Sequence, residues 1–145
     1  MYYVGVAAYA PYLQLYYGSV GITVAGVGAL SAFSSLIALV SAPIWGAISD
    51  RNPESRFLIP LASMIAAFGG LSVGTVGGSP LIVPSVACFS MGLAGTGPMM
   101  DVLVLHMTSA DRSRYASVRV FGSLGFIVAT PLIGFAIHQV YRDLF

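Results

Sequence analysis

Two charged residues lie within long apolar stretches, and their types and spacing point to solute binding. Asp101 lies between the apolar segments 97–100 and 102–105, and Arg119 follows 18 positions later. If these stretches span a membrane, a carboxylate at mid-depth costs about 2.5–3.5 kcal/mol to insert, so it needs a partner or a watery cavity. The guanidinium of an arginine is a planar fork of donors that fits solute hydroxyls or a carboxylate. We predict an Asp101–Arg119 pair that lines a solute pathway; the alternative is an ion pair that only fixes helix packing.

A second group of polar side chains lies near the start of the chain. Tyr9, Tyr12 and Tyr16 recur at helical spacing and form one aromatic stripe, with Gln14 in the same segment. We predict that Gln14, Tyr9 and Tyr12 contribute to solute binding. The same stripe equally fits a seam between helices or a belt at the membrane interface.

The composition excludes most soluble functions. Of the 145 residues, 57% are hydrophobic and 8% are charged, and the net charge is +1. In a typical soluble domain about a quarter of all residues are charged. A soluble enzyme or a nucleic-acid-binding protein is therefore not expected. Because Cys88 is the single cysteine, we expect no internal disulfide, no metal site and no cofactor. No activated nucleophile is apparent either, so we expect no catalytic residues.

Uncharged stretches define the elements that must position these side chains. Asp, Glu, Lys and Arg are absent from residues 1–49, 57–100 and 120–141, and a spanning helix needs about 20 apolar residues. Turn residues at 18–21 and 77–80 divide the two longer stretches. The sequence thus predicts an all-α integral membrane protein with a single transmembrane domain over residues 1–145. Its five transmembrane helices are expected near 1–17, 23–49, 57–76, 81–108 and 114–139.

The arginines predict the orientation in the membrane. Arg51 and Arg56 lie between the second and third expected helices, and Arg112 and Arg114 lie between the fourth and fifth. Because basic residues concentrate in cytoplasmic loops, these two loops and the N-terminus are expected on the cytoplasmic side.

The segment after the second expected helix carries a recognisable motif. The residues Gly46-Ala47-Ile48-Ser49-Asp50-Arg51, followed by Arg56, resemble the signature loop of the major facilitator superfamily, although Pro53 stands where the family usually has a glycine. The resemblance implies that Gly46, Asp50, Arg51 and Arg56 act in a gating loop between two transporter halves.

A second motif resembles a narrower group of that superfamily. The segment 115–126, which contains Arg119 and Gly122, is similar to the start of the fifth helix in the lactose permease, phenylpropionate permease and nucleoside–proton symporter group. In the lactose permease an acidic residue precedes that arginine by 18 positions and follows a proline by three, as Pro98, Asp101 and Arg119 do here. The resemblance implies that Asp101 and Arg119 are the substrate-binding acid and arginine.

The superfamily fold implies a larger protein than this chain. It has twelve spans in two halves with a midplane binding site, so we expect a partial N-terminal six-helix half and a fragment whose C-terminal half is a missing partner. The implied function is secondary active transport in a bacterial inner membrane, by alternating access, with proton-coupled symport of a sugar, nucleoside or aromatic acid. The alternative is a small membrane subunit or scaffold that binds partner helices and transports nothing.

Overall fold

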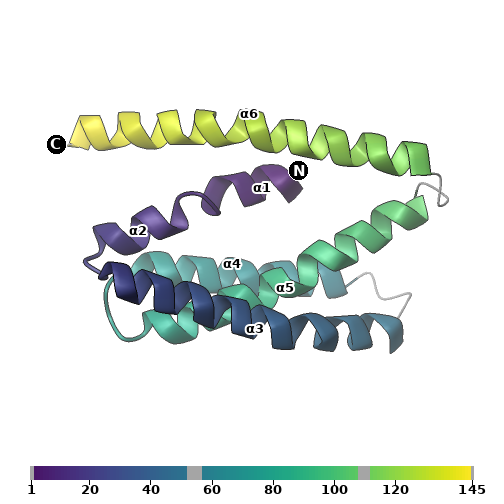
Figure 1. Cartoon of the computed structure of the whole chain (residues 1–145), viewed down its shortest axis with the longest axis horizontal. Helices are drawn as coiled ribbons and strands as arrows, with labels where there is room; N and C mark the ends of the chain where they lie inside the picture. Colours follow the sequence, from purple (N-terminus) through teal and green to yellow (C-terminus); the bar gives the residue numbers. More distant parts are fainter. Residues whose placement is uncertain (1, 52–56, 108–111, 145) are drawn as a thin grey trace. The chain divides into compact units, whose positions relative to one another are not determined.

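The chain is helical throughout the part that can be described. The computed structural model describes residues 2–51, 57–107 and 112–144, and all regular secondary structure within them is α-helix (Figure 1). These residues form two compact units, one made of residues 1–16 and 107–145 and the other of residues 17–106. The all-α fold class predicted from the uninterrupted apolar runs is confirmed.

The first unit is built around one long helix. Helix α6 (Arg112–Leu144) runs beside α1 (Tyr2–Tyr9), and the start of α2 (Leu13–Ser19) follows α1 along the chain (Figure 1). Within α6, the segment Tyr115–Gln139 is long and apolar enough to span a membrane. The unit therefore joins the two ends of the described chain through the contact between α1 and α6.

The first expected helix, over 1–17, is interrupted in the middle. Its two pieces, α1 and α2, have 8 and 7 residues. The Ala10 N–H still donates to the Val6 carbonyl at 3.0 Å, but Pro11 has no N–H with which to continue the ladder. The chain turns instead, and the Tyr12 N–H donates to the Tyr9 carbonyl at 3.0 Å. The missing N–H of Pro11 thus divides into two helices a segment for which the composition alone predicts one.

The second unit contains three long helices. They are α3 (Val24–Arg51), α4 (Leu58–Val76) and α5, which is Ile82–Met107 and extends one residue beyond the unit. Together with α6, they are the four helices among the described residues that are long and apolar enough to cross a membrane. All four begin and end within five residues of the expected ranges. The turns between α2 and α3 and between α4 and α5 lie at predicted glycines, since Gly21 and Gly77 have φ of 83° and 54°, a region that favours glycine.

Glycines allow α4 and α5 to pack with their backbones close together. A Cβ atom added to Gly69 would overlap the backbone of Phe89, and one added to Gly92 would lie 2.6 Å from the Ala62 carbonyl oxygen. Such close approach through small residues is typical of membrane helices, where packing replaces the hydrophobic driving force. The glycines of this region therefore act as packing positions, in line with the apolar sequence around them.

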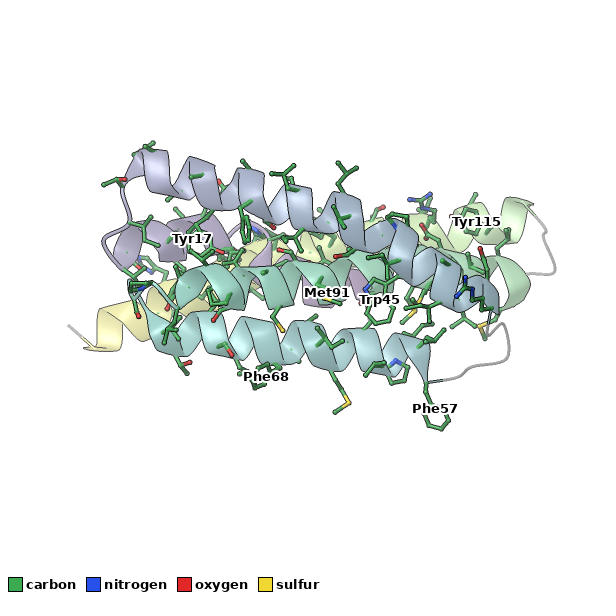
Figure 2. The ribbon with its side chains drawn as sticks, turned by 90° about the horizontal axis from the view of Figure 1, so that it is seen from below. Tyr17, Trp45, Phe57, Phe68, Met91 and Tyr115 are labelled. Carbon is green, nitrogen blue, oxygen red and sulfur yellow. The ribbon has the colours of Figure 1, made fainter. Side chains whose placement is uncertain are left out.

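The single tryptophan joins α3 to α5. The Trp45 indole N–H donates to the Met91 carbonyl at 2.8 Å, and its ring covers Gly95, where an added Cβ would lie 2.6 Å from the nearest indole carbon. Trp45 is 5% exposed and is seen beside Met91 in Figure 2. By contrast, Phe57 and Phe68 on the α4 side point away from the helices in that view and are 80% and 68% exposed, as lipid-facing side chains would be.

Candidate functional site

Arg119 forms a local pair with an aromatic residue on α6. Its Nη1 donates to the Tyr115 hydroxyl at 3.3 Å, and its guanidinium carbon lies 5.7 Å from the centre of the Tyr115 ring. The pair forms because residues four apart lie on the same face of a helix. The surrounding surface is apolar, since Val118, Val120 and Phe121 are all exposed. A cation on such a surface inside a membrane requires polar surroundings.

Asp101 lies on α5, in the second unit. Its side chain is half-buried, and Pro98 lies three residues before it inside the helix. Because proline cannot donate to the carbonyl four residues earlier, it removes one helical hydrogen bond about a turn from the carboxylate. Arg119 belongs to the first unit, so the Asp101–Arg119 pair stays a prediction.

Tyr12 binds the backbone of α6. Its hydroxyl donates to the Thr130 carbonyl at 2.6 Å, and it lies over Gly134, where an added Cβ would come 2.5 Å from the hydroxyl oxygen. The glycine four residues after Thr130 leaves room for the aromatic side chain to reach that carbonyl. Tyr12 is therefore a residue of a helix contact, which is one of the three interpretations that the aromatic stripe allowed.

The contact of Tyr12 lies well along α6 from Arg119. Thr130 follows Arg119 by 11 residues on the same helix, which is about three turns and about 17 Å of helical rise. Eleven residues also return to nearly the same face of a helix, so Arg119 and Thr130 share one side of α6. A single small solute is shorter than this separation. Tyr12 and Arg119 therefore lie at different heights along α6, too far apart to contact one small solute together.

The other residues predicted in the first segment lie on either side of the helix break. Tyr9 is the last residue of α1 and is half-buried, whereas Gln14 is the second residue of α2 and is exposed. Tyr9, Tyr12 and Gln14 thus lie within three residues of Pro11 along the chain. Their role in binding solute stays a prediction.

The gating motif forms the end of α3. Gly46, Asp50 and Arg51 are exposed on its last two turns, and Arg56 lies outside the described residues. A cation is favoured at a helix C-terminus and an anion is disfavoured there. Arg51 therefore stabilises the end of α3, while Asp50 does not.

Three contacts of the structure were not predicted from the sequence. A lone tryptophan in an apolar span must find an acceptor for its N–H, which is a signal for Trp45. An aromatic residue four positions before an arginine is a signal for the Tyr115–Arg119 pair. The Tyr12–Thr130 bond joins residues 118 positions apart, and no local pattern marks it.

Long apolar helices, closely packed through glycine and carrying isolated charges, define the chain as a helical integral membrane protein. Comparison with known protein families identifies the family of the chain. The model of the MFS_1 like family matches residues 1–145, and the chain belongs to this family. The expected superfamily is thereby confirmed, while the narrower group around the lactose permease stays a prediction.

The relatives are transport proteins. The chain is 29% identical over 115 residues to the uncharacterized transporter YwbF of Bacillus subtilis (strain 168), an alignment that covers 79% of this chain and 29% of that protein. It is 26% identical over 110 residues to the maltose permease of Geobacillus stearothermophilus, covering 76% of this chain and 28% of that protein. The chain thus spans less than a third of the length of either relative. No solved structure matches it significantly. Both relatives carry the name of a transport protein, a transporter in one case and a permease in the other.

Proposed function

We propose that the chain forms the N-terminal part of a secondary active transporter that takes up a small organic solute together with protons. Family membership over the whole chain supports transport, and both relatives are named as a transporter or a permease. The missing partner is the rest of the same transporter, which would supply the second half of an alternating-access cavity. We place the protein in a bacterial inner membrane with its N-terminus in the cytoplasm.

The observation that carries the proposed site is the position of Arg119. A guanidinium on the apolar surface of a candidate span is tolerated where it faces a polar cavity or a partner. We propose that Arg119 binds the solute directly and that Asp101 provides the second charged contact. In this proposal Tyr12 holds the first segment against α6, and Tyr9 and Gln14 lie further along the pathway.

A hydroxyl-rich solute suits this pair of charges best. A sugar hydroxyl can accept a hydrogen bond from a guanidinium and donate one to a carboxylate, so a sugar can use both residues at once. An aromatic acid would pair with Arg119 alone and would be repelled by Asp101. The maltose permease relative favours the same choice. We therefore propose a sugar, with nucleosides and aromatic acids as the other classes to be tested.

The gating proposal concerns the end of α3. We propose that Gly46, Asp50 and Arg51, together with Arg56, contact the second half of the transporter and bias the equilibrium between the inward-open and outward-open states. A neutral residue in place of Asp50 should change the rate of uptake more than the affinity for solute.

Uptake by cells tests the proposed function. The complete reading frame that contains this chain would be expressed in bacteria, and uptake of radiolabelled maltose, uridine and phenylpropionate would be measured with and without a protonophore. We expect maltose uptake that the protonophore abolishes. Arg119→Ala should abolish uptake, and Arg119→Lys should retain a small part of it, because lysine keeps the charge and loses the fork. The exposed neighbour Val120 provides the control variant Val120→Ala.

The outcomes separate the parts of the proposal. Unchanged uptake in Arg119→Ala would refute the assigned site, and uptake insensitive to the protonophore would refute proton coupling. If Asp101 and Arg119 act together, Asp101→Asn and Arg119→Gln combined should lose little more than either alone. A correctly inserted protein that takes up none of the three solutes would favour the non-transporting subunit.

A further inference from the structure

We propose that Tyr115 is a positioning residue that holds the Arg119 guanidinium ready for the solute. The inference rests on the proposed role of Arg119 in solute binding. It starts from the contact already described, in which the guanidinium lies near the Tyr115 ring and donates to its hydroxyl. Tyr115 is half-buried and Arg119 is exposed, so the more buried side chain supports the more exposed one.

The ring of Tyr115 contributes more to this contact than its hydroxyl does. The hydroxyl accepts from Nη1 at 3.3 Å, which is longer than the usual range for an N–H···O bond. The guanidinium carbon is 5.7 Å from the ring centre, within the distance at which an aromatic face attracts a cation. This attraction is stronger in surroundings of low dielectric constant, and the neighbouring valine and phenylalanine side chains of α6 are apolar.

The Tyr115 hydroxyl accepts from one nitrogen of the Arg119 guanidinium, Nη1. A guanidinium has five N–H donors in one plane, so it can bind Tyr115 and an oxygen-bearing solute together. An arginine on an open helix surface samples many rotamers, and binding must order it. A ring that already restricts the side chain lowers this entropic cost, so Tyr115 should lower the KM for solute and leave the maximal rate nearly unchanged.

Uptake kinetics with matched variants test this role. In the complete transporter, Tyr115→Leu removes the ring, whereas Tyr115→Phe removes only the hydroxyl. For maltose we expect Tyr115→Leu to raise KM about threefold to thirtyfold, the range that corresponds to a cation–π contact. We expect Tyr115→Phe to stay within about threefold of the wild type. Equal KM values for the two variants, high or low, would overturn the proposal.

A double variant separates positioning from a purely structural role. If Tyr115 acts through Arg119, Tyr115→Leu should have little further effect in the Arg119→Gln background. An undiminished effect there would show that Tyr115 acts by itself and would overturn the inference. Membrane abundance and thermal unfolding of each variant show whether Tyr115→Leu has simply failed to fold.

A spectroscopic measurement tests the contact without any solute. In detergent micelles, the Arg119 Nε–H resonance of the protein, labelled with ¹⁵N-arginine and assigned with Arg119→Lys, should carry a ring-current shift. The shift should persist in Tyr115→Phe and disappear in Tyr115→Leu. Its absence from the wild type would refute the contact. Unchanged uptake in Arg119→Ala with the shift present would refute the proposed function instead, and the positioning role with it, while leaving the contact in place.

Discussion

Replacing Gly95 by alanine should displace Trp45 and weaken the second unit. The added Cβ would lie 2.6–2.8 Å from three carbons of the indole, so the ring must move. Overpacking of this kind costs about 1–3 kcal/mol, and the lost hydrogen bond from the indole to Met91 adds about 1 kcal/mol. The better helix propensity of alanine offsets about 1 kcal/mol. We expect Gly95→Ala to lower the free energy of unfolding by about 1–3 kcal/mol.

Unfolding in detergent provides the assay for this prediction. The free energy of unfolding would be measured by titration with sodium dodecyl sulfate and far-ultraviolet circular dichroism. Trp45 is the chain's single tryptophan, so its emission reports the local change, and it should shift to the red in Gly95→Ala. The control is Gly28→Ala on α3, where an added Cβ meets nothing within 4 Å. This variant should be as stable as the wild type or more stable by up to about 1 kcal/mol.

Size compensation distinguishes overpacking from a general effect of the mutation. Trp45→Leu in the Gly95→Ala background should be less destabilising than the two single variants predict together, because a smaller side chain leaves room for the new methyl group. The reasoning would be refuted if Gly95→Ala unfolded like the wild type with unchanged tryptophan emission. It would also be refuted if the two variants were additive.

Further predictions concern the other close contacts. Tyr12→Phe keeps the ring and loses the bond to the Thr130 carbonyl, so the free energy of unfolding should fall by about 1 kcal/mol in the same titration. Gly69→Ala places a methyl group against the backbone of α5, which no side-chain rotation relieves, and should cost about 2–3 kcal/mol. Its control on the same helix, Gly74→Ala, meets nothing within 4 Å and should cost less than about 0.5 kcal/mol; equal losses in the two variants would contradict the packing role of Gly69.

The sequence was sufficient for the long helices and for their approximate positions. Uncharged apolar stretches predicted the long helices of both units, and the glycines at 21 and 77 predicted two of the turns. Both signals are local in the sequence. The first segment was predicted as one helix over 1–17, because its apolar composition continues through Pro11. The interruption between α1 and α2 is therefore known only from the backbone structure.

The candidate site was predictable in its residue types and less so in its contacts. Asp101 and Arg119 were identified because charges are expensive in an apolar span. The partners of Tyr12 and Trp45 are backbone carbonyls, which every residue carries, so their identity cannot be read from side-chain types. The distance of about 17 Å along α6 between the Tyr12 contact and Arg119 likewise follows only once the bond from Tyr12 to Thr130 is known.

The bonds from Trp45 to Met91 and from Tyr12 to Thr130 have the same form, an aromatic donor that reaches a carbonyl four residues before a glycine. Apolar side chains in a bilayer give little preference for one longitudinal alignment of two helices over another. A slide by one turn, about 5.4 Å, would preserve much of that contact. The slide would also move the Trp45 N–H and the Tyr12 O–H to carbonyls that have no glycine beside them. A side chain would then cover the carbonyl, and the donor would be left without an acceptor in hydrocarbon. The two glycines therefore set which turn of one helix lies beside which turn of the next.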